Sequence, residues 1–563
     1  MRSADSGRLP RRIGHASNAE SAPVGQLEDS QAAVEKGVEI VMSPAVLPRV
    51  LAVLILVTGG LAGPAGAQEG GAATPNVVLI LADDLGWGDV GAVHPNSAIR
   101  TPHIDRLADE GMRFVDAHSP SGVCTPTRYA LLTGRYTWRT RLTRGVLGGY
   151  SPPLLEPNRP TLGTLLQAQG YRTAAIGKWH LGMDMPYLDA AAERSEPWEG
   201  DPGIDFGGAI ADSPIHHGFD EYFGVSASLD MAPYVYIRND RFTALPTHEQ
   251  PAVPFPHFIR HGPRADDFVI DEVLDRLVDE AVGFIDRSSR TGDPFFLYLP
   301  LTAPHKPTQP HERFRGRTDL GEYGDFVAQV DDAVGQVVAA LDRAGAGDGT
   351  LVIFTSDNGS YMYRRDDAEP DHVDDASIQA YRVGRHRSNA DWRGTKADIW
   401  EGGHRVPFVA RWPGVVEPGT ETAATVVHTD LYATLAEIVG VTPGPDAAED
   451  SVSLLPMLRG EPVTRGVPVV HHSSGGMFAI RDGAWKLVLG NGSGGRQEPR
   501  GEPFGRPYQL FDLSRDPAEA HDVAADHPEV VERLEATLER FRRTGRSAPL
   551  SGATSTSGAI VRR

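Results

Sequence analysis

Three short runs of large apolar residues constrain the fold of this chain more than any other feature. They occupy residues 76–81, 295–299 and 351–355, and they lack the alternation of polar and apolar side chains that marks a half-exposed strand. Such runs are typical of strands that are buried on both faces, as in parallel sheets covered by helices. We therefore expect these three segments to lie at the centre of a sheet.

Segments with helical patterns separate these runs. Residues 101–111 begin with Thr-Pro and end with Gly, as many helices do, and residues 161–169 and 323–344 also have helical patterns. Residues 172–176 are predicted to form a further short strand. Strands that alternate with helices indicate an α/β fold, with a mostly parallel sheet flanked by helices on both faces.

The pattern changes near residue 462, and this change divides the chain. We expect a large domain over residues 68–461, a smaller α+β subdomain over 462–546, and a disordered Ser/Thr/Gly-rich tail over 547–563. The subdomain is predicted from a hairpin with an Asp-Gly turn, a further strand and an amphipathic helix, at residues 478–489, 508–513 and 528–543.

Residues 1–67 contain a pattern that is typical of a secretory signal peptide. The apolar run at 49–57 is too short to span a bilayer, and an Ala-Gly-Ala cleavage pattern follows at 65–67. A membrane anchor is the weaker alternative because glycines and a proline break the run early. We therefore expect export to the periplasm or the extracellular space without a membrane anchor, with either Met1 or Met42 as the initiator.

The charge balance argues against nucleic acid as a partner. The chain has 75 acidic and 54 basic residues and a formal net charge of −21. An acidic surface disfavours nucleic acids and anionic membranes. It also disfavours polyanionic substrates in general, so an anionic substrate would have to be captured by a local pocket of positive charge.

Polar residues directly follow two of the predicted strands. Asp83 and Asp84 come after the first apolar run, and Asp357 and Asn358 come after the third. Ligands of parallel sheets bind at the carboxyl ends of the strands, so these side chains are expected to meet. Two adjacent acidic residues could simply cap a turn. Together, however, the four side chains form an all-oxygen set that suits Ca²⁺ or Mg²⁺ rather than zinc.

Cys124 is the only cysteine of the chain, and it lies in the sequence Cys-Thr-Pro-Thr-Arg at 124–128. Exported proteins usually pair their cysteines or lack them, so this residue is either catalytic or an unpaired thiol. Its context resembles the Cys-x-Pro-x-Arg signature of the type I, formylglycine-dependent sulfatases, which include the arylsulfatases. The resemblance implies that a formylglycine-generating modification machinery oxidises Cys124 to formylglycine, an aldehyde.

Residues 170–182 resemble the second signature of the same family. Lys178 and His180 stand two positions apart at a predicted strand end, so both side chains can point to one side of an extended segment. Taken alone, they would be an ordinary surface lysine and surface histidine. Because the first signature is present in the same chain, we interpret them as residues of the site.

Later positions also match the family, and the resemblance covers about residues 76–522 in the family's order. His305 follows Ala-Pro and resembles the histidine that faces the leaving group. Lys396 ends an Arg-Gly-x-Lys element that supplies a second lysine. Ser228 aligns with a sulfate-binding serine. Residues 401–407 resemble a Glu-Gly-Gly-x-Arg-Val-Pro stretch that we interpret as structural.

The resemblance implies an alkaline-phosphatase-like fold, in which the large domain is the sulfatase catalytic domain. It implies hydrolysis of sulfate monoesters to an alcohol and inorganic sulfate. One Ca²⁺ would be bound by Asp83, Asp84, Cys124, Asp357 and Asn358. The catalytic residues would be Cys124, Arg128, Lys178, His180, His305 and Lys396. The sulfate group would be bound by Ser228, Lys178, His305 and Lys396.

The family's mechanism then assigns a role to each of these groups. One hydroxyl of the hydrated aldehyde at position 124, held by Arg128, attacks sulfur. His305 protonates the leaving alcohol together with Lys396. His180 accepts a proton from the second hydroxyl, and sulfate leaves.

Two other functions are compatible with parts of this pattern. A phosphonate or phosphate ester hydrolase can share the fold and the modified cysteine. A non-catalytic secreted glycan-binding protein can share the fold alone, although no catalytic residue is missing here. The expected substrate is a sulfated carbohydrate or an aryl sulfate. The loops at 185–217, 238–268 and 361–390 are expected to select it, and the last is predicted to be a solvated loop or, alternatively, a substrate-shaping insertion.

Overall fold

The computed structural model describes residues 74–189, 196–463 and 465–550. The predicted signal peptide and both candidate initiators lie outside these residues. Within the described ranges, none of the helices has the length and apolar character needed to cross a membrane.

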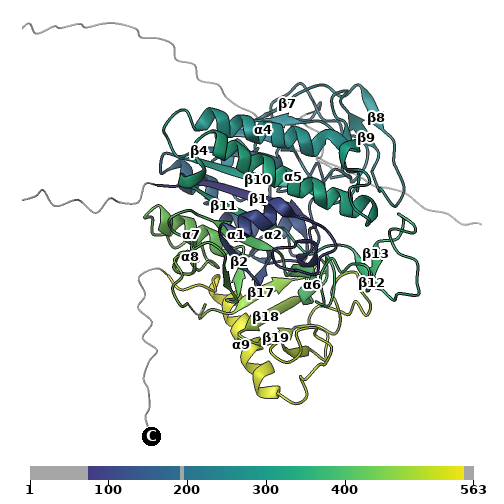
Figure 1. Cartoon of the computed structure of the whole chain (residues 1–563), viewed down its shortest axis with the longest axis vertical. Helices are drawn as coiled ribbons and strands as arrows, with labels where there is room; N and C mark the ends of the chain where they lie inside the picture. The colour runs from purple at the N-terminus through teal and green to yellow at the C-terminus, as the bar shows by residue number, and fades with distance from the viewer. Residues whose placement is uncertain (1–73, 190–195, 464, 551–563) are drawn as a thin grey trace, which may run out of the picture. The chain divides into compact units, whose positions relative to one another are not determined.

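A sheet of ten strands forms the centre of the described chain (Figure 1). The spatial order of its strands is β15 (Thr420–Thr422), β2 (Met112–Phe114), β14 (Phe408–Arg411), β11 (Thr350–Ser356), β1 (Asn76–Asp83), β10 (Phe295–Pro304), β4 (Arg172–Lys178), β5 (Glu221–Val225), β6 (Ile237–Arg238) and β7 (Arg241–Phe242). The strands from β11 to β5 are parallel to one another. β14 and β6 run antiparallel to their neighbours. The parallel centre confirms the prediction, and the margins make the sheet mixed.

The central strand β10 is longer than the sequence pattern indicates. The predicted strand ended at Leu299, whereas β10 continues to Pro304. Two prolines and a threonine in this extension are not typical of a central strand, so the pattern missed it. All of the extension is buried, and it carries the chain to the edge of the sheet where Asp83 ends β1.

Helices cover the sheet in two groups. In the first group α1 (Pro102–Asp109), α4 (Val273–Ser288) and α5 (Gly321–Arg343) pack together, and α4 and α5 contact β10. In the second group α2 (Cys124–Thr133), α3 (Leu162–Gln167) and α7 (Asp430–Ile438) pack together, and α3 contacts β4. The helices predicted from the sequence correspond to α1, α3 and α5, with ends that differ by no more than two residues.

The C-terminal part forms a separate antiparallel sheet (Figure 1). Its strands are, in order, β17 (Val469–His472), β18 (Phe478–Asp482), β19 (Trp485–Val488) and β20 (Gln509–Asp512). The helix α9 (Pro528–Thr544) packs on β18 and β19. The predicted hairpin is present, and its turn residue Gly483 has a φ of 61°, which favours glycine.

The C-terminal tail is held at its start. Ser547, where we expected disorder to begin, donates a hydrogen bond from its hydroxyl group to Asp450 at 2.8 Å. Its backbone N–H donates a second bond to the carbonyl oxygen of Glu449. The predicted boundary is therefore too early, because a composition rich in small polar residues does not reveal such contacts. Residues 551–563 lie outside the described residues.

Buried ion pairs connect the two sheets. Glu401 begins the short helix α6 (Glu401–His404) and lies 3.0 Å from Lys486 on β19. Asp116, between β2 and β3, lies 2.6 Å from Arg405, directly after α6, and 2.8 Å from Arg481 on β18. The sequence interpretation of residues 401–407 as structural agrees with these contacts.

The acidic part of residues 361–390 is exposed, as expected, although other parts of the segment pack against the protein. β12 (Tyr363–Arg365) and β13 (Ala380–Arg382) form a small parallel sheet. Asp371 is fully buried and lies 3.1 Å from Arg385. Asp371 is the exception, because the other acidic residues of the segment are exposed: Asp366, Asp367, Glu369, Asp374 and Asp375.

The other described elements are short. β3 (Ala117–His118) pairs with β16 (Val426–Val427), and β8 (His248–Gln250) pairs with β9 (Gly262–Arg264). A further short element is the helix α8 (Leu455–Leu458). Tight helical turns occupy Trp87–Asp89, Thr137–Arg139, Pro214–His217, Ile270–Glu272, Glu312–Phe314 and Gly347–Gly349.

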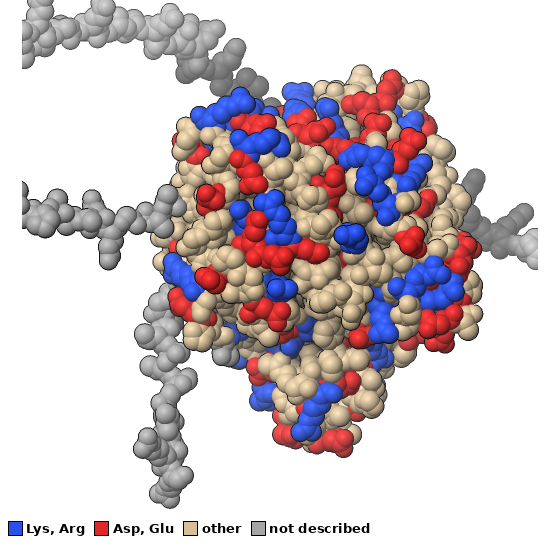
Figure 2. All heavy atoms as spheres, viewed as in Figure 1, with Lys and Arg blue, Asp and Glu red and all other residues tan. Residues whose placement is uncertain are grey.

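On the face shown in Figure 2, acidic and basic side chains are interspersed, so the negative net charge does not form one continuous acidic surface there.

Candidate active site

The residues predicted for the site gather at the carboxyl ends of the parallel strands. Asp83 ends β1 and Lys178 ends β4. His305 and Asp357 directly follow β10 and β11. Since these strands are neighbours, their ends lie at one edge of the sheet, where ligands of such sheets bind.

Arg128 and Asp357 form a fully buried ion pair behind the site. Nη2 and Nε of Arg128 lie 2.7 Å and 3.1 Å from Oδ2 of Asp357. Nη1 of Arg128 donates a hydrogen bond to the carbonyl oxygen of Lys178 at 2.9 Å. The other carboxylate oxygen of Asp357 accepts a bond from the backbone N–H of Asp84 at 3.1 Å. The pair therefore fixes the ends of three strands and α2 relative to one another.

Two buried lysines neutralise the tandem carboxylates. Nζ of Lys178 lies 2.7 Å from Asp83, and Nζ of Lys396 lies 2.7 Å from Asp84. Burial opposes ionisation of Asp83, but the neighbouring cationic groups, Lys178 foremost, together outweigh it and hold the pKa of Asp83 well below its usual range. Burial also opposes the charge on Lys396, but the neighbouring acidic groups, Asp84 foremost, together outweigh it and raise the pKa of Lys396. Asp83 and Lys396 are therefore ionised at neutral pH.

The donor atoms in the site could bind a metal ion. One ligand atom from each of Asp83, Asp84, Cys124 and His305 lies within 4.8 Å of the others. Oδ1 of Asp83 and Oδ1 of Asn358 are buried and accept no hydrogen bond from any described residue. Carboxylate and amide oxygens are the ligands that Ca²⁺ and Mg²⁺ prefer. The residues therefore fit the hard divalent cation that the sequence predicts.

Cys124 is the first residue of α2 and is only 2% exposed. Its sulfur lies 3.6 Å from Nζ of Lys396. Burial raises the pKa of the thiol to about 12, although Lys178 and Lys396 oppose the shift. The thiolate is the reactive form of cysteine, so this side chain is a poor nucleophile at neutral pH.

The two predicted histidines have defined hydrogen-bonding partners. Nδ1 of His305 lies 2.6 Å from the carbonyl oxygen of Lys306, so Nδ1 carries a hydrogen and Nε2 is left 3.7 Å from Asp84. Nε2 of His180 lies 2.8 Å from the carbonyl oxygen of Leu147, to which it donates. Nδ1 of His180 is buried and has no hydrogen-bond partner among the described residues. Burial lowers the pKa of both histidines.

The backbone of the site adopts conformations that most residues avoid. Asp84 and His180 have φ values of 67° and 57°, in the left-handed region. Gly177 has a φ of 135°, and a Cβ atom there would lie 1.9 Å from the carbonyl oxygen of Pro300. Such conformations cost free energy and occur most often at functional sites, where the surrounding structure enforces them.

A cavity of about 510 Å³ adjoins these residues. The predicted residues that line it are Asp84, Cys124, His180, Ser228, His305 and Lys396. The hydroxyl group of Ser228 is buried and lacks a partner within the described chain. Arg128, Lys178, Asp83, Asp357 and Asn358 do not line the cavity; they lie behind the lining residues.

Several further residues line the cavity that the sequence interpretation missed. They are Trp198, Asp230, Phe255, Phe258, Arg260, Lys306 and Arg496. Lys306 adjoins His305, and Asp230 stands two residues after Ser228, so proximity to a motif could have identified both. Trp198 lies in the loop 185–217, and Phe255, Phe258 and Arg260 lie in the loop 238–268, both of which were expected to select the substrate. The sequence did not indicate which of their side chains face the cavity, and it did not mark Arg496 at all.

The fold and the site together define an α/β enzyme whose cationic pocket suits an anionic ester. Comparison with known proteins gives the same class. A family model described as Sulfatase matches residues 75–441. An N-acetylgalactosamine-6-O-sulfatase of Bacteroides thetaiotaomicron is 32% identical over 505 residues, with 83% of this chain and 93% of the relative covered. Arylsulfatase A of Bos taurus is 32% identical over 499 residues, with 84% of this chain and 89% of the relative covered.

The solved structures agree. One similar structure comes from work on the metabolism of multiple glycosaminoglycans by Bacteroides thetaiotaomicron. It matches this chain with a TM-score of 0.71 and 30% sequence identity, and the match covers 84% of this chain and 99% of that chain. The chain therefore belongs to the sulfatase family. It is a sulfuric ester hydrolase with an alkaline-phosphatase-like fold, as the motifs predicted.

Proposed function

We propose that this enzyme removes sulfate from a carbohydrate by means of a formylglycine formed from Cys124 and one bound Ca²⁺. The observation that carries this proposal is the state of Cys124. Its thiol is buried and has a pKa of about 12, yet it lies 3.6 Å from Lys396 beside a cluster of metal-binding oxygens. An unmodified thiol is unreactive in this position, whereas a hydrated aldehyde places a hydroxyl group there.

Ca²⁺ is proposed to be bound by Asp83, Asp84, Asp357, Asn358 and the modified residue 124. The free oxygens of Asp83 and Asn358 support this set. When bound, the ion supplies positive charge for the sulfate oxygens, and the hydrated aldehyde supplies the nucleophile.

The protein's own cations hold the sulfate group. Lys396 lines the cavity, and Lys178 lies behind it, so their charges converge on one side of the bound ester. Arg128 fixes Asp357 and thereby the ends of the strands. The unpartnered hydroxyl group of Ser228 is available as a donor to a sulfate oxygen.

Two histidines move the protons. Asp84 beside Nε2 of His305 opposes the lowering of its pKa by burial and by Lys396. A proton on this nitrogen passes to the leaving alcohol oxygen as its bond to sulfur breaks. Lys396 assists from the same side. His180 donates from Nε2 to the backbone, so its free Nδ1 is the atom that accepts a proton when sulfate departs.

The substrate is proposed to be a sulfated carbohydrate, with small aryl sulfates as incidental substrates. Among the relatives is a sulfatase named for N-acetylgalactosamine sulfate, which supports a sugar. A cavity of about 510 Å³ is large enough for a sugar residue with its sulfate group. We further propose that the chain is exported through its N-terminal leader and is modified by the cell's formylglycine-generating machinery.

Two measurements test this proposal. Mass spectrometry of the peptide around Cys124 should show loss of sulfur and a group that reacts with hydrazides, and an intact thiol in fully active enzyme would disprove the modification. Initial rates on a panel of sulfated monosaccharides should exceed those on the matching phosphate esters. Faster cleavage of a phosphate or phosphonate ester would instead identify the alternative hydrolase, and no turnover of any ester would identify a binding protein.

A further inference from the structure

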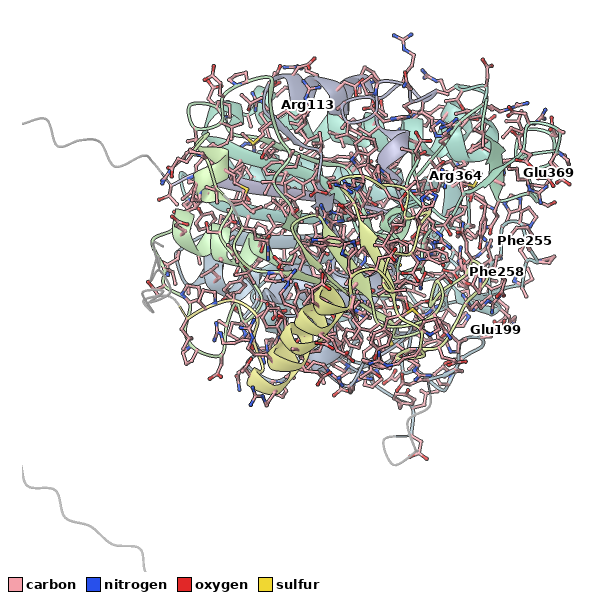
Figure 3. The ribbon with its side chains drawn as sticks, turned by 90° about the horizontal axis from the view of Figure 1, so that it is seen from below. Arg113, Glu199, Phe255, Phe258, Arg364 and Glu369 are labelled. Carbon is pink, nitrogen blue, oxygen red and sulfur yellow. The ribbon has the colours of Figure 1, made fainter. Side chains whose placement is uncertain are left out.

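Exposed aromatic side chains line the cavity of the active site. Trp198, Phe255 and Phe258 belong to its lining, yet they are 45%, 45% and 41% exposed. Phe255 and Phe258 lie in the loop between β8 and β9, and Figure 3 shows both on the same side of the molecule. Aromatic rings at the opening of a polar pocket provide flat apolar surfaces, against which the C–H face of a sugar ring can pack.

Cations hold these aromatic side chains in place. The guanidinium carbon of Arg260 lies 4.7 Å from the ring centre of Phe258 and 5.1 Å from that of Trp198. Nζ of Lys306 lies 4.6 Å from the ring centre of Phe255. Arg260 forms an ion pair with the buried Asp230, so its charge is neutralised.

Lys306 and Arg496, by contrast, have no anionic partner within the described part of the chain. Neither side chain forms an ion pair or donates a hydrogen bond to a described residue, although both line the cavity. Arg496 is tied to the protein through its backbone N–H, which donates to Asp398 at 2.6 Å. The carboxylates that act on Lys306, those of Asp84 and Asp230, are already paired with Lys396 and Arg260.

We propose that Lys306 and Arg496 bind a second anionic group of the substrate, and that Trp198, Phe255 and Phe258 hold the sugar residue that bears it. This inference rests on the proposed carbohydrate sulfatase function and specifies its substrate class. The substrate is an acidic oligosaccharide with the scissile sulfate on one residue and a carboxylate or a second sulfate on its neighbour.

The distribution of charge favours this substrate over one with a single sulfate. Lys178 and Lys396 are paired with Asp83 and Asp84 beside the scissile group, so that group already has its own set of charges. Partly buried charges without partners cost free energy, and a second oxyanion would relieve that cost. The planar guanidinium of Arg496 can bind a carboxylate or a sulfate with two parallel hydrogen bonds.

Binding to an inactive enzyme tests the inference without turnover. Cys124→Ala protein with Ca²⁺ is titrated by calorimetry with a disaccharide of a hexuronic acid and the sulfated hexosamine that the wild-type enzyme hydrolyses. The second ligand is the same disaccharide with its carboxylate reduced to an alcohol, and the third carries a second sulfate on the reduced sugar. We expect either oxyanion to lower Kd about tenfold or more relative to the neutral analogue.

Variants assign the effect to the named residues. Lys306→Gln with Arg496→Gln should abolish the preference for the charged disaccharides. Arg500→Gln removes the same charge four residues from Arg496, outside the cavity lining, and should retain the preference. Trp198→Ala should weaken all three ligands alike, because stacking on a sugar ring does not depend on the second charge.

The binding data and the activity data test the second anionic subsite and the proposed function separately. Equal binding of the charged and neutral disaccharides, or a preference that survives in the double variant, would overturn the inference while leaving carbohydrate sulfatase activity intact. A wild-type enzyme that hydrolyses aryl sulfates but no sulfated sugar would instead overturn the proposed function, and with it this inference. The preferred oxyanion shows which of the two acidic groups the substrate carries.

Discussion

Nζ of Lys396 lies 3.6 Å from the sulfur of Cys124, although 272 positions separate the two residues. The same ammonium group lies 2.7 Å from Asp84. Lys396 therefore connects the residue proposed to be modified with the carboxylates proposed to bind Ca²⁺. Its charge is retained despite burial because Asp84 raises the pKa of Lys396.

Replacing Lys396 by methionine keeps the length of the side chain and removes its charge. We expect kcat/KM on a sulfate ester to fall about a hundredfold or more, because a preorganised charge beside the reacting group is lost. Lys396→Arg should retain more activity than Lys396→Met. Steady-state kinetics on both variants measure this, and an unchanged kcat/KM in Lys396→Met would contradict the assigned role.

Removal of the metal should lower stability as well as activity. A ligand that binds only the folded state stabilises it, by about 2.7 kcal/mol at a hundred times Kd. Chelation should therefore reduce the melting temperature, and Ca²⁺ should restore it. Asn358→Leu removes one free oxygen and should reduce the shift that Ca²⁺ produces. A melting temperature that is insensitive to chelator and to added Ca²⁺ would exclude a resident metal at this site.

The centre of the fold could be predicted because buried strands have a simple signature. The run at 76–81 and the run at 351–355 became β1 and β11, and their parallel pairing brings Asp83 close to Asp357. The order of the motifs then indicated which side chains meet. The extension of β10 to Pro304 was missed because burial, rather than residue type, makes it a strand.

The surroundings of the scissile group could not be predicted in the same way. Trp198 and Arg496 reach one cavity from loops nearly three hundred residues apart, and loop conformations leave no periodic signal. Whether Lys306 has a counter-ion depends on what faces it in space, which only the structure shows. The motif residues are therefore predictable from the sequence one by one. For the residues proposed to select the substrate, the sequence indicated only the loops 185–217 and 238–268, and not the side chains that face the cavity.

The buried pair of Arg128 and Asp357 should contribute strongly to stability. In Ca²⁺-free protein, Arg128→Met leaves an unpaired carboxylate in the interior, and loss of one partner of a buried pair typically costs about 3–5 kcal/mol. Urea unfolding of the variant measures this loss. Arg128→Met combined with Asp357→Leu should be less destabilised than the sum of the single variants, because no buried charge is then left. Strict additivity would show that the two charges do not interact.

Buried histidines should make the protein sensitive to mild acid. Burial lowers the pKa of His428 to about 3 and of His472 to about 4, and it lowers the pKa of His404 and His471 as well. At a pH above about 6.5 these side chains are neutral in both the folded and the unfolded state, so stability is at its full value. As the pH falls below about 6.5, only the unfolded chain takes up these protons, and each costs about 1.4 kcal/mol per pH unit.

His472 allows this contribution to be isolated. Between about pH 6.5 and pH 5 its share of the loss is about 2 kcal/mol, because its folded-state pKa lies below that window. His472→Leu cannot be protonated, so the free energies of unfolding measured in urea at the two pH values should differ by about 2 kcal/mol less than in the wild type. His521→Gln serves as the control, because the side chain of His521 is 82% exposed. In this variant the difference between the free energies of unfolding at the two pH values should be the same as in the wild type. If His472→Leu loses as much stability on acidification as the wild type does, His472 must be protonated in the folded protein, and burial does not keep it neutral.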